Sequence, residues 1–209
     1  MGGAQTDNGK LLTDNFSDMV PRPVLVTSRA EKAVEAKRLG FDLVCVPLDL
    51  PEPQALDPGE IVETKARAAH AVLQRPVIVE DSGLSIVAWE GFPGALIKWL
   101  ERSAGVAALP RMLDGFSDRS ATAVCAIAYF DGSRIVAARG EAAGRIVSAP
   151  RGSGGFGWDA LFVPEGSDRT FAEMTGEEKD ALSHRRRAWE ALANRIGEVE
   201  RETEPPEGR

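Results

Sequence analysis

A run of glycines in the last third of the chain limits most strongly how the backbone can fold. Four of the six residues from 152 to 157 are glycine, and Phe156, Trp158 and Asp159 lie in or beside this run. Glycine permits sharp turns and lets the backbone approach a ligand closely. The run therefore predicts a loop that grips a flat ligand. The alternative is a hairpin whose two aromatic side chains enter the core.

The glycine spacing also satisfies the dinucleotide-binding pattern G-x-G-x-x-G at Gly152, Gly154 and Gly157. That pattern requires a helix directly after the glycines, because the helix N-terminus holds the pyrophosphate. Here the glycines lead into residues 158–163, which have the character of a strand that ends at Pro164. We interpret the match as accidental, and a dinucleotide-dependent oxidoreductase is the least favoured function.

Length and composition favour one globular domain. The 209 residues are 43% hydrophobic and 27% charged, values typical of globular proteins. Both ends are polar and lack periodicity, so we expect a disordered leader at 1–19, one domain at 20–197 and a disordered tail at 198–209. The net charge of -7 argues against a nucleic-acid polymer as partner. No apolar run suits a membrane span and the first residues lack a secretory signal, which predicts a cytoplasmic protein with no membrane partner.

Cysteine and histidine are too few for a metal centre built from sulfur or imidazole ligands. Cys45 and Cys125 stand in apolar, strand-like runs, which predicts buried free thiols. His70 and His184 are the only histidines. A metal ion would have to be held by carboxylate oxygens, which favours Mg²⁺, with Mn²⁺ as the alternative.

The first strand and helix predict a binding site for phosphate. Residues 23–27 form an apolar strand that leads into Ser28, which we expect to form a capping box at the start of a helix over residues 30–39. A strand that ends at a helix N-terminus leaves backbone N–H groups free to bind phosphate. Arg29 and Lys32 stand in the first turn, where cations oppose the helix dipole. Anion binding therefore competes with the interpretation of two solvated surface cations.

Two adjacent carboxylates follow a short apolar strand. Residues 76–79 suit the middle of a sheet, and Glu80, Asp81 and Ser82 come directly after them, at the expected C-terminal end of the strand. Burial of two carboxylates is costly unless a cation or several donors compensate. We therefore predict a metal-binding or catalytic role for this pair, with Glu52 in the preceding acidic loop as a further candidate ligand.

The other elements follow from hydrophobic periodicity and turn residues. We expect a strand at 41–46, helices at 60–73, 95–111 and 177–196, a hairpin of 122–130 and 134–142, and a strand at 160–163. In the helix at 95–111 we expect Leu96, Trp99 and Leu100 to face inward. In the last helix a stripe with helical spacing contains Leu182, Arg185, Trp189, Leu192 and Ile196. An arginine in a core stripe needs a carboxylate or a ligand, and a structural ion pair is the alternative to ligand binding.

Together, these groups match a nucleoside triphosphate with its own metal ion. Cations suit the polyphosphate, carboxylates suit Mg²⁺, and aromatic and polar groups suit a nucleobase. The respective sets are Arg29, Lys32, Lys65 and Lys98; Glu52 and Asp81; and Phe156, Trp158, Asp159, His184 and Arg185.

Six segments resemble the inosine triphosphate pyrophosphatase family, and they are more similar to its eukaryotic form. They are LPEPQ, VEDSGL, PGALIKW, PRGSGGFGWD, FAEM and EEKDALSHRRRA, and the resemblance runs from about Val24 to Ile196. It implies hydrolysis of ITP, dITP and XTP to the monophosphate and pyrophosphate, which cleanses the nucleotide pool. It also implies an α/β fold with an elongated mixed sheet, flanking helices and two lobes around a central substrate cleft, a homodimer, and Mg²⁺ as cofactor.

The resemblance also assigns site residues. Glu52 and Asp81 correspond to metal ligands, and we expect Asp81 to be the catalytic residue. The substrate-binding set is Thr27, Ser28, Arg29, Lys32, Lys65, Ser82, Lys98, Phe156, Gly157, Trp158, Asp159, Lys179, His184 and Arg185. The chain departs from the family's first motif, T-G-N-x-x-K, because Ser28 and Arg29 replace its glycine and asparagine. The segment from Glu52 to Lys65 is also longer than usual, which favours Asp81 over Glu52 as a ligand.

We expect a water molecule to attack the α-phosphorus, with pyrophosphate leaving and Asp81 orienting or deprotonating the water. Mg²⁺ at Glu52 and Asp81 would neutralise phosphate charge and lower the pKa of a bound water. Arg185 and backbone N–H groups aimed at O6 would select a 6-oxo purine, because a 6-amino group leaves those donors unpaired. The altered first motif keeps open a nucleotide-binding protein with weak or no hydrolysis. A related pyrophosphatase with pyrimidine preference is another alternative.

Overall fold

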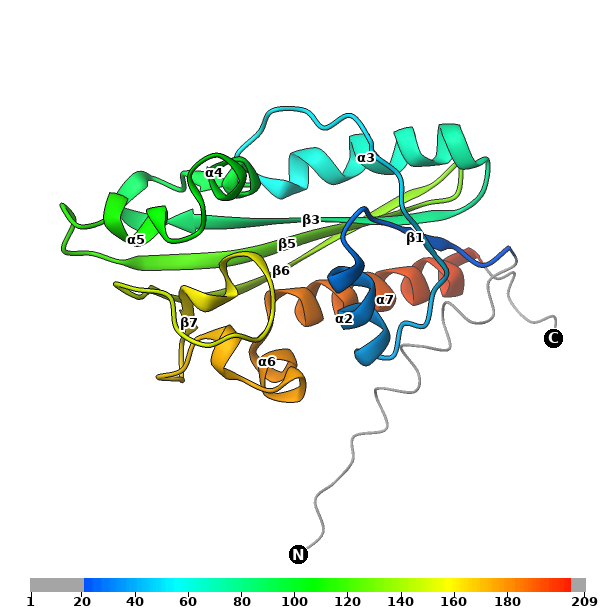
Figure 1. The fold of residues 1–209 in the computed structure, drawn as a ribbon. Coiled ribbons are helices and arrows are strands. Elements are labelled where there is room, and N and C mark those ends of the chain that lie inside the picture. Colours follow the sequence, from blue (N-terminus) through cyan, green and yellow to red (C-terminus); the bar gives the residue numbers. More distant parts are fainter. Residues whose placement is uncertain (1–20, 204–209) are drawn as a thin grey trace, which may run out of the picture.

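The computed structural model describes residues 21–203, and within them a seven-stranded mixed sheet lies between two layers of helices (Figure 1). The strand order is β2-β1-β3-β5-β6-β7, and β4 pairs with β3 beside this path. The strands are β1 (Val24–Val26), β2 (Cys45–Val46), β3 (Val77–Ile86), β4 (Pro93–Gly94), β5 (Ser120–Phe130), β6 (Ile135–Ile146) and β7 (Phe162–Pro164). β2 and β3 pair in parallel with β1, and the remaining pairings are antiparallel. The expected α/β fold with a mixed sheet and flanking helices is confirmed, while the leader predicted at 1–19 lies outside the described residues.

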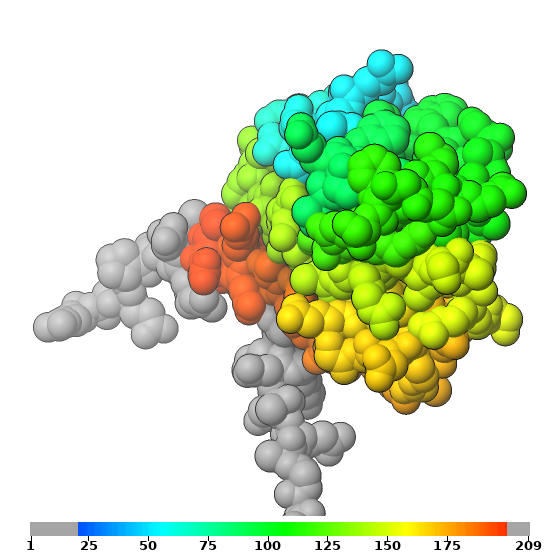
Figure 2. Space-filling model, turned by 90° about the vertical axis from the view of Figure 1, so that its left-hand side faces the viewer, coloured from blue at the N-terminus to red at the C-terminus, as the bar shows by residue number. Residues whose placement is uncertain are grey.

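Helices cover both faces of the sheet. α3 (Pro58–Leu73) lies along one face, and α2 (Ala30–Arg38) and α7 (His184–Thr203) lie along the other (Figure 1). α4 (Ile97–Ala104) and α5 (Ala108–Met112) cover the left-hand end of the sheet in Figure 1, on the same side as α3. α6 (Gly176–Leu182) lies on the same side as α7. Viewed from that end, the green residues of α4 and α5 sit above the yellow residues that follow β6 (Figure 2). None of the helices between residues 21 and 203 is long and apolar enough to cross a membrane.

β3 organises the core because a strand directs alternate side chains to opposite faces. Ile78 belongs to the hydrophobic cluster that contains Trp189 of α7, whereas Val77 and Val79 belong to the cluster that contains Val62 of α3. Full burial of an aliphatic side chain of this size contributes about 1.5–3 kcal/mol. The central strand therefore ties both helical layers to one sheet.

β3 is longer than the strand predicted at 76–79. It continues through Glu80, Asp81 and Ser82 to Ile86, and it pairs with β5 over its whole length. The two carboxylates therefore lie within a central strand and not at its C-terminal end. The sequence pattern ends the strand too early because charged residues interrupt the apolar run, whereas in the fold cationic side chains from the helices compensate those charges.

The connection around α2 differs from its prediction. The capping box expected at Ser28 is wrong: Arg29 occupies the N-cap position without a side-chain cap, and its N–H donates to Thr27 Oγ1 at 3.1 Å. The strand predicted at 41–46 shortens to Cys45–Val46. The Phe41 N–H donates to the Ala36 carbonyl oxygen at 2.9 Å, so its backbone bonds to α2 and not to a strand, and its buried ring stacks on Trp189 with centroids 4.7 Å apart.

The prediction of two buried thiols holds for Cys125 but is wrong for Cys45. Cys45 lies on β2, which ends the strand order of the sheet and therefore has a neighbouring strand on one side only. Cys125 lies on β5 between β3 and β6, where both faces of the sheet are covered.

Two helices predicted as continuous are each divided. Gly105, with φ of 77°, ends α4, and the extended Ser183 separates α6 from α7. Trp99 is 54% exposed, so the expectation that it faces inward is wrong. The predicted core stripe is confirmed for Arg185, Trp189, Leu192 and Ile196 of α7, which are buried. Leu182, its first member, lies on α6 and is only partly buried. α7 extends to Thr203, so residues 198–203 are helical and not a disordered tail, and the remainder of the predicted tail lies outside the described residues.

Candidate active site

A cavity of about 410 Å³ brings the predicted site residues together from seven segments. Its walls come from the β1–α2 connection with the start of α2, the loop before α3, α3 itself, β3, α4, the glycine loop and the start of α7. Every predicted site residue except Lys179 lines it: Thr27, Ser28, Arg29, Lys32, Glu52, Lys65, Asp81, Ser82, Lys98, Phe156, Gly157, Trp158, Asp159, His184 and Arg185. The cavity is therefore the candidate active site.

Two lysines and two carboxylates form a cluster on the α3 side of the cavity. Lys65 Nζ lies 2.9 Å from Glu52 Oε1 and 3.4 Å from Asp81 Oδ1, and Lys98 pairs with the other oxygen of Glu52. Asp57 caps α3 by accepting from the Gly59 N–H at 2.9 Å, and the helix then carries Lys65 on its buried face. Burial lowers the pKa of Lys98, and the nearby cations add to that effect.

The carboxylates of Glu52 and Asp81 are oxygen donors of the kind that Mg²⁺ prefers. Asp81 Oδ2 is buried and has no hydrogen-bond partner in the described part of the chain, and Glu52 reaches the same lysine as Asp81. Between residues 21 and 203 no group of three or more His, Cys, Asp or Glu side chains is placed to hold a metal. Mg²⁺ commonly binds through one or two carboxylates together with phosphate oxygens and water. The donor set therefore fits Mg²⁺ bound with a phosphate and does not fit a metal cage made by protein alone.

A buried ion-pair network lies behind the opposite wall. Arg185 Nε donates to Glu80 Oε1 at 2.9 Å, Nη2 donates to Ser82 Oγ at 3.0 Å, and Nη1 donates to Glu35 Oε2. Burial alone would raise the pKa of Glu80, but Arg185 and Lys32 outweigh it and hold that pKa below its ordinary value. The structural ion pair considered for Arg185 is therefore present, and the guanidinium also borders the cavity.

Lys179 belongs to this network and not to the cavity wall. Its Nζ lies 2.6 Å from Glu35 Oε1 and 2.6 Å from Asp159 Oδ2. Asp159 Oδ2 also accepts from the Phe156 N–H at 2.8 Å. These contacts anchor the glycine loop to α2 and α6. Lys179 and Asp159 therefore have a structural role in addition to the predicted role in substrate binding.

The glycine loop ends in a single turn of 3-10 helix over Gly157–Ala160. The strand predicted at 160–163 begins later, as β7 at Phe162, because residues 157–160 form this turn, which the Asp159 carboxylate stabilises by accepting from the Phe156 N–H. A dinucleotide site needs an α-helix after the glycines, and a four-residue 3-10 turn is not one. Gly152 is required for packing, since a Cβ there would lie 2.5 Å from the backbone of Ala172.

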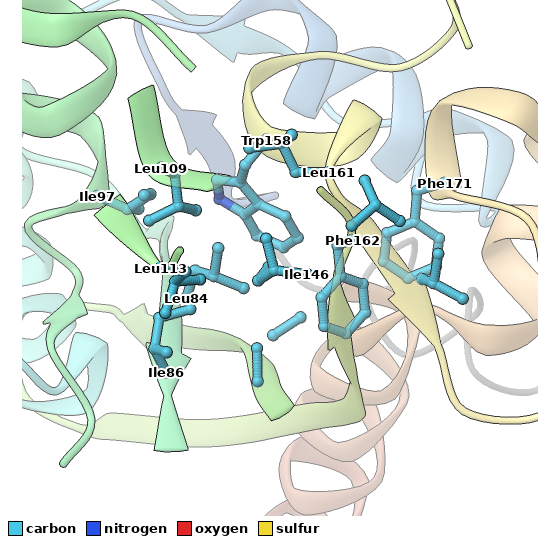
Figure 3. Packing of buried hydrophobic residues seen from close by; sticks show 14 of the residues in the cluster. Leu84, Ile86, Ile97, Leu109, Leu113, Ile146, Trp158, Leu161, Phe162 and Phe171 are labelled. Atoms are coloured by element: carbon cyan, nitrogen blue, oxygen red, sulfur yellow. The ribbon is translucent and has the colours of Figure 1, made fainter. Parts of the chain in front are cut away.

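The two aromatic side chains of the loop have different roles. Trp158 is 8% exposed and points among Leu109, Ile146 and Leu161 (Figure 3), so the core alternative applies to most of its ring. Phe156 is half-buried at the cavity wall, and Lys179 Nζ lies 5.0 Å from its ring centroid. Phe156 is therefore the aromatic that can stack on a flat ligand.

His184 is buried at the first position of α7. Its ring lies 5.4 Å from the Trp158 ring and 6.2 Å from the Phe171 ring, as measured between centroids. Neither ring nitrogen has a hydrogen-bond partner within residues 21–203. Burial, followed by the charges of Arg185 and Lys179, holds the pKa of His184 well below its ordinary value of 6.5. The imidazole is therefore neutral at physiological pH.

Comparison with known proteins identifies the family of a chain with this fold and this cavity. A model of the Ham1 family matches residues 23–195. The chain belongs to the Ham1 family. It is 43% identical over 175 residues to the inosine triphosphate pyrophosphatase of Yarrowia lipolytica, with 81% of this chain and 92% of that protein covered. It is 39% identical over 181 residues to the dITP/XTP pyrophosphatase of Thermococcus kodakarensis, with 85% and 98% covered.

Solved Ham1 structures share the fold. The Ham1 protein from Coxiella burnetii matches with a TM-score of 0.71 and 30% identity, covering 84% of this chain and 98% of that one. The Staphylococcus aureus Ham1 protein matches with a TM-score of 0.70 and 26% identity, covering 87% and 100%. The resemblance found in the sequence motifs is thus confirmed along most of the chain.

The sequence motifs of this Ham1 chain did not indicate two acidic residues at the site. Glu35 pairs with both Arg185 and Lys179. It could have been found by its spacing, because Lys32, Glu35 and Ala36 share the buried face of α2. Glu101 lines the cavity and pairs with Arg29 at 3.4 Å. Its only signal is a position one helical turn after Lys98.

Proposed function

We propose that this Ham1 chain hydrolyses the non-standard purine nucleoside triphosphates ITP, dITP and XTP to the nucleoside monophosphate and pyrophosphate. One observation carries the proposal: a single cavity places groups suited to a polyphosphate and groups suited to a base side by side. Cationic side chains of α2, α3 and α4 line it together with Phe156 of the glycine loop and Arg185 of α7. Relatives named as pyrophosphatases of ITP and of dITP/XTP support the choice of substrate.

The residues of the α3 side carry the reaction in this proposal. Glu52 and Asp81 would hold Mg²⁺, which supplies charge neutralisation and a bound water of lowered pKa. Asp81 Oδ2, free of other partners among the described residues, orients the attacking water at the α-phosphorus and accepts its proton. Lys65 and Lys98 neutralise the charge that develops on the leaving pyrophosphate.

The opposite wall provides selectivity for the base. A guanidinium has five N–H donors. Each of the three nitrogen atoms of Arg185 donates one hydrogen bond, to Glu80, Glu35 or Ser82. Those contacts fix its plane, and the remaining donors can meet the O6 of a base that stacks on Phe156, whose ring centroid lies 5.4 Å from Arg185 Cζ. A 6-amino group would leave such donors unpaired in a dry pocket, which disfavours adenine.

Pyrophosphate release tests the function directly. The purified chain with Mg²⁺ should release pyrophosphate from ITP, dITP and XTP far faster than from ATP or CTP, and EDTA should stop the reaction. Asp81→Asn should lower kcat by about 100-fold or more, because it removes a group that orients and deprotonates water. Asp42→Asn, an exposed carboxylate remote from the cavity, is the matched control. Binding of ITP without pyrophosphate release would instead identify a nucleotide-binding protein, and faster release from CTP would indicate a pyrimidine enzyme.

The assembly and location of the chain are part of the same proposal. We expect a homodimer, as the family resemblance implies, and action in the cytoplasm on the free nucleotide pool. Size-exclusion chromatography with light scattering should give the mass of two chains, and a mass of one chain at micromolar concentration would contradict the dimer.

A further inference from the structure

Glu101 of α4 has one carboxylate oxygen that no group between residues 21 and 203 engages in a hydrogen bond. Its side chain is 12% exposed, and Oε2 accepts from Arg29 Nη2 at 3.4 Å. Oε1 is buried and has no hydrogen-bond partner in the described part of the chain. A buried acceptor without a partner is rare and unfavourable, so it calls for a ligand or a structural reason.

The free oxygen points to the junction between the two halves of the cavity. A Cβ built on Gly157 would lie 3.0 Å from Oε1, so this oxygen faces the glycine loop directly after Phe156. The other oxygen holds Arg29, which belongs to the proposed phosphate loop. Glu101 thus connects the segment that would hold the base with the segment that would hold the phosphates.

In any nucleoside triphosphate the sugar joins the base to the α-phosphate, so it must pass this junction. A phosphate oxygen is an anionic acceptor and would repel the carboxylate, whereas a sugar hydroxyl donates a hydrogen bond. We propose that Glu101 recognises the sugar of the substrate, with Oε1 accepting a hydrogen bond from a ribose hydroxyl. The inference rests on the proposed function, because it takes the cavity as the site of a nucleoside triphosphate.

Arg29 is a positioning residue in this arrangement. By pairing with Oε2 it fixes the carboxylate plane so that Oε1 is directed at the glycine loop. Burial raises the pKa of Glu101, Arg29 acts against this, and Asp159 adds to it. The assignment does not depend on the balance, because both the carboxylate and the carbonyl oxygen of the neutral acid accept from a hydroxyl.

Three inosine nucleotides that differ only in their sugar hydroxyls test the inference. Values of kcat/KM are measured for ITP, dITP and 2′,3′-dideoxy-ITP with the unmodified chain and with Glu101→Ala. The substitution should lower kcat/KM for ITP by about tenfold or more, the loss expected for a hydrogen bond to a charged group. The dideoxy substrate should change by less than about twofold. The result for dITP then assigns the contact to the 2′- or the 3′-hydroxyl. Glu101→Gln, which keeps an oxygen acceptor, should recover part of the activity on ITP.

A second set of variants separates a direct contact from an effect that acts through Arg29. In an Arg29→Asn background, Glu101→Ala should still reduce activity on ITP more than on the dideoxy substrate. Ser103→Ala, on the exposed face of α4, controls for substitution in this helix, and thermal unfolding checks that each variant folds. An equal loss on ITP and the dideoxy substrate, as a contact to the base would give, overturns the inference, and so does no loss at all. If the unmodified chain releases pyrophosphate from none of the three, the proposed function itself has failed.

Discussion

Acidification should destabilise this protein through the burial of His184. The ring is enclosed by Trp158 and Phe171 and has no hydrogen-bond partner within residues 21–203. Arg185 and Lys179 lie close enough to oppose a further positive charge. The folded state therefore holds the neutral imidazole, while the unfolded chain binds a proton below its ordinary pKa of 6.5.

The sign and size of the effect follow from this difference in proton binding. Because the pKa of His184 is lower in the folded state, its contribution is fully present above pH 6.5 and is lost as the pH falls from 6.5 toward the folded-state pKa. Each pH unit in that window lowers the free energy of unfolding by about 1.4 kcal/mol. Between pH 7.5 and pH 5.5 we expect a loss of roughly 1–2 kcal/mol from this residue.

Urea denaturation at several pH values measures the effect. His184→Phe, which keeps an aromatic ring between the two neighbouring rings but cannot bind a proton, should remove that part of the pH dependence even if its absolute stability differs. His70→Gln, at the other histidine of the chain, is the control, because His70 is half-exposed on α3. If unfolding free energies of the unmodified chain and His184→Phe fall in parallel from pH 7.5 to 5.5, or if His70→Gln has the same effect as His184→Phe, the reasoning is refuted.

Three further outcomes are expected. Gly140→Ala should lower the free energy of unfolding by roughly 1–3 kcal/mol, because its Cβ would lie 2.2 Å from the His184 carbonyl oxygen on α7. Gly115→Ala is the control, since its Cβ would meet nothing within 4 Å. Equal urea midpoints for the two variants would contradict the steric argument. Arg185→Ala should narrow the preference for ITP over ATP in kcat/KM, and an unchanged ratio would remove this residue from base recognition. Glu52→Gln should raise the Mg²⁺ concentration needed for half-maximal pyrophosphate release, and an unaltered Mg²⁺ titration would exclude Glu52 as a ligand.

Local patterns in the sequence were enough to predict elements that local chemistry determines. The hairpin of β5 and β6 forms around Asp131 and Gly132, because the carboxylate accepts from the following backbone N–H groups and the glycine adopts φ of 103°. The buried face of α7 was also predicted, because the helical spacing of its apolar residues determines which of them face the sheet. The length of β3 could not be predicted in this way, since its charged residues are compensated by side chains of other elements: Asp81 by Lys65 of α3, and Glu80 by Arg185, which is 105 positions away.

The site shows the same division between local and long-range information. Lys65 of α3, Asp81 of β3 and Lys98 of α4, which the sequence motifs predicted as site residues, line one cavity. The partnership of Glu101 with Arg29 spans 72 positions and joins a helix to a loop, so it has no local signature. Trp158 illustrates the converse, because an aromatic residue in a glycine loop can serve a ligand or the core, and only packing decides between them.

The unbroken passage of β3 through Glu80, Asp81 and Ser82 also limits how the gene can change. Glu80 and Ser82 face Arg185 on one side of the sheet, and Asp81 faces Lys65 on the other. Insertion or deletion of a single codon would turn each of these side chains to the wrong face, because the side-chain period of a strand is two. Homologues should therefore vary in residue type but not in length between Val77 and Ile86, and length changes should collect in the loop before α3.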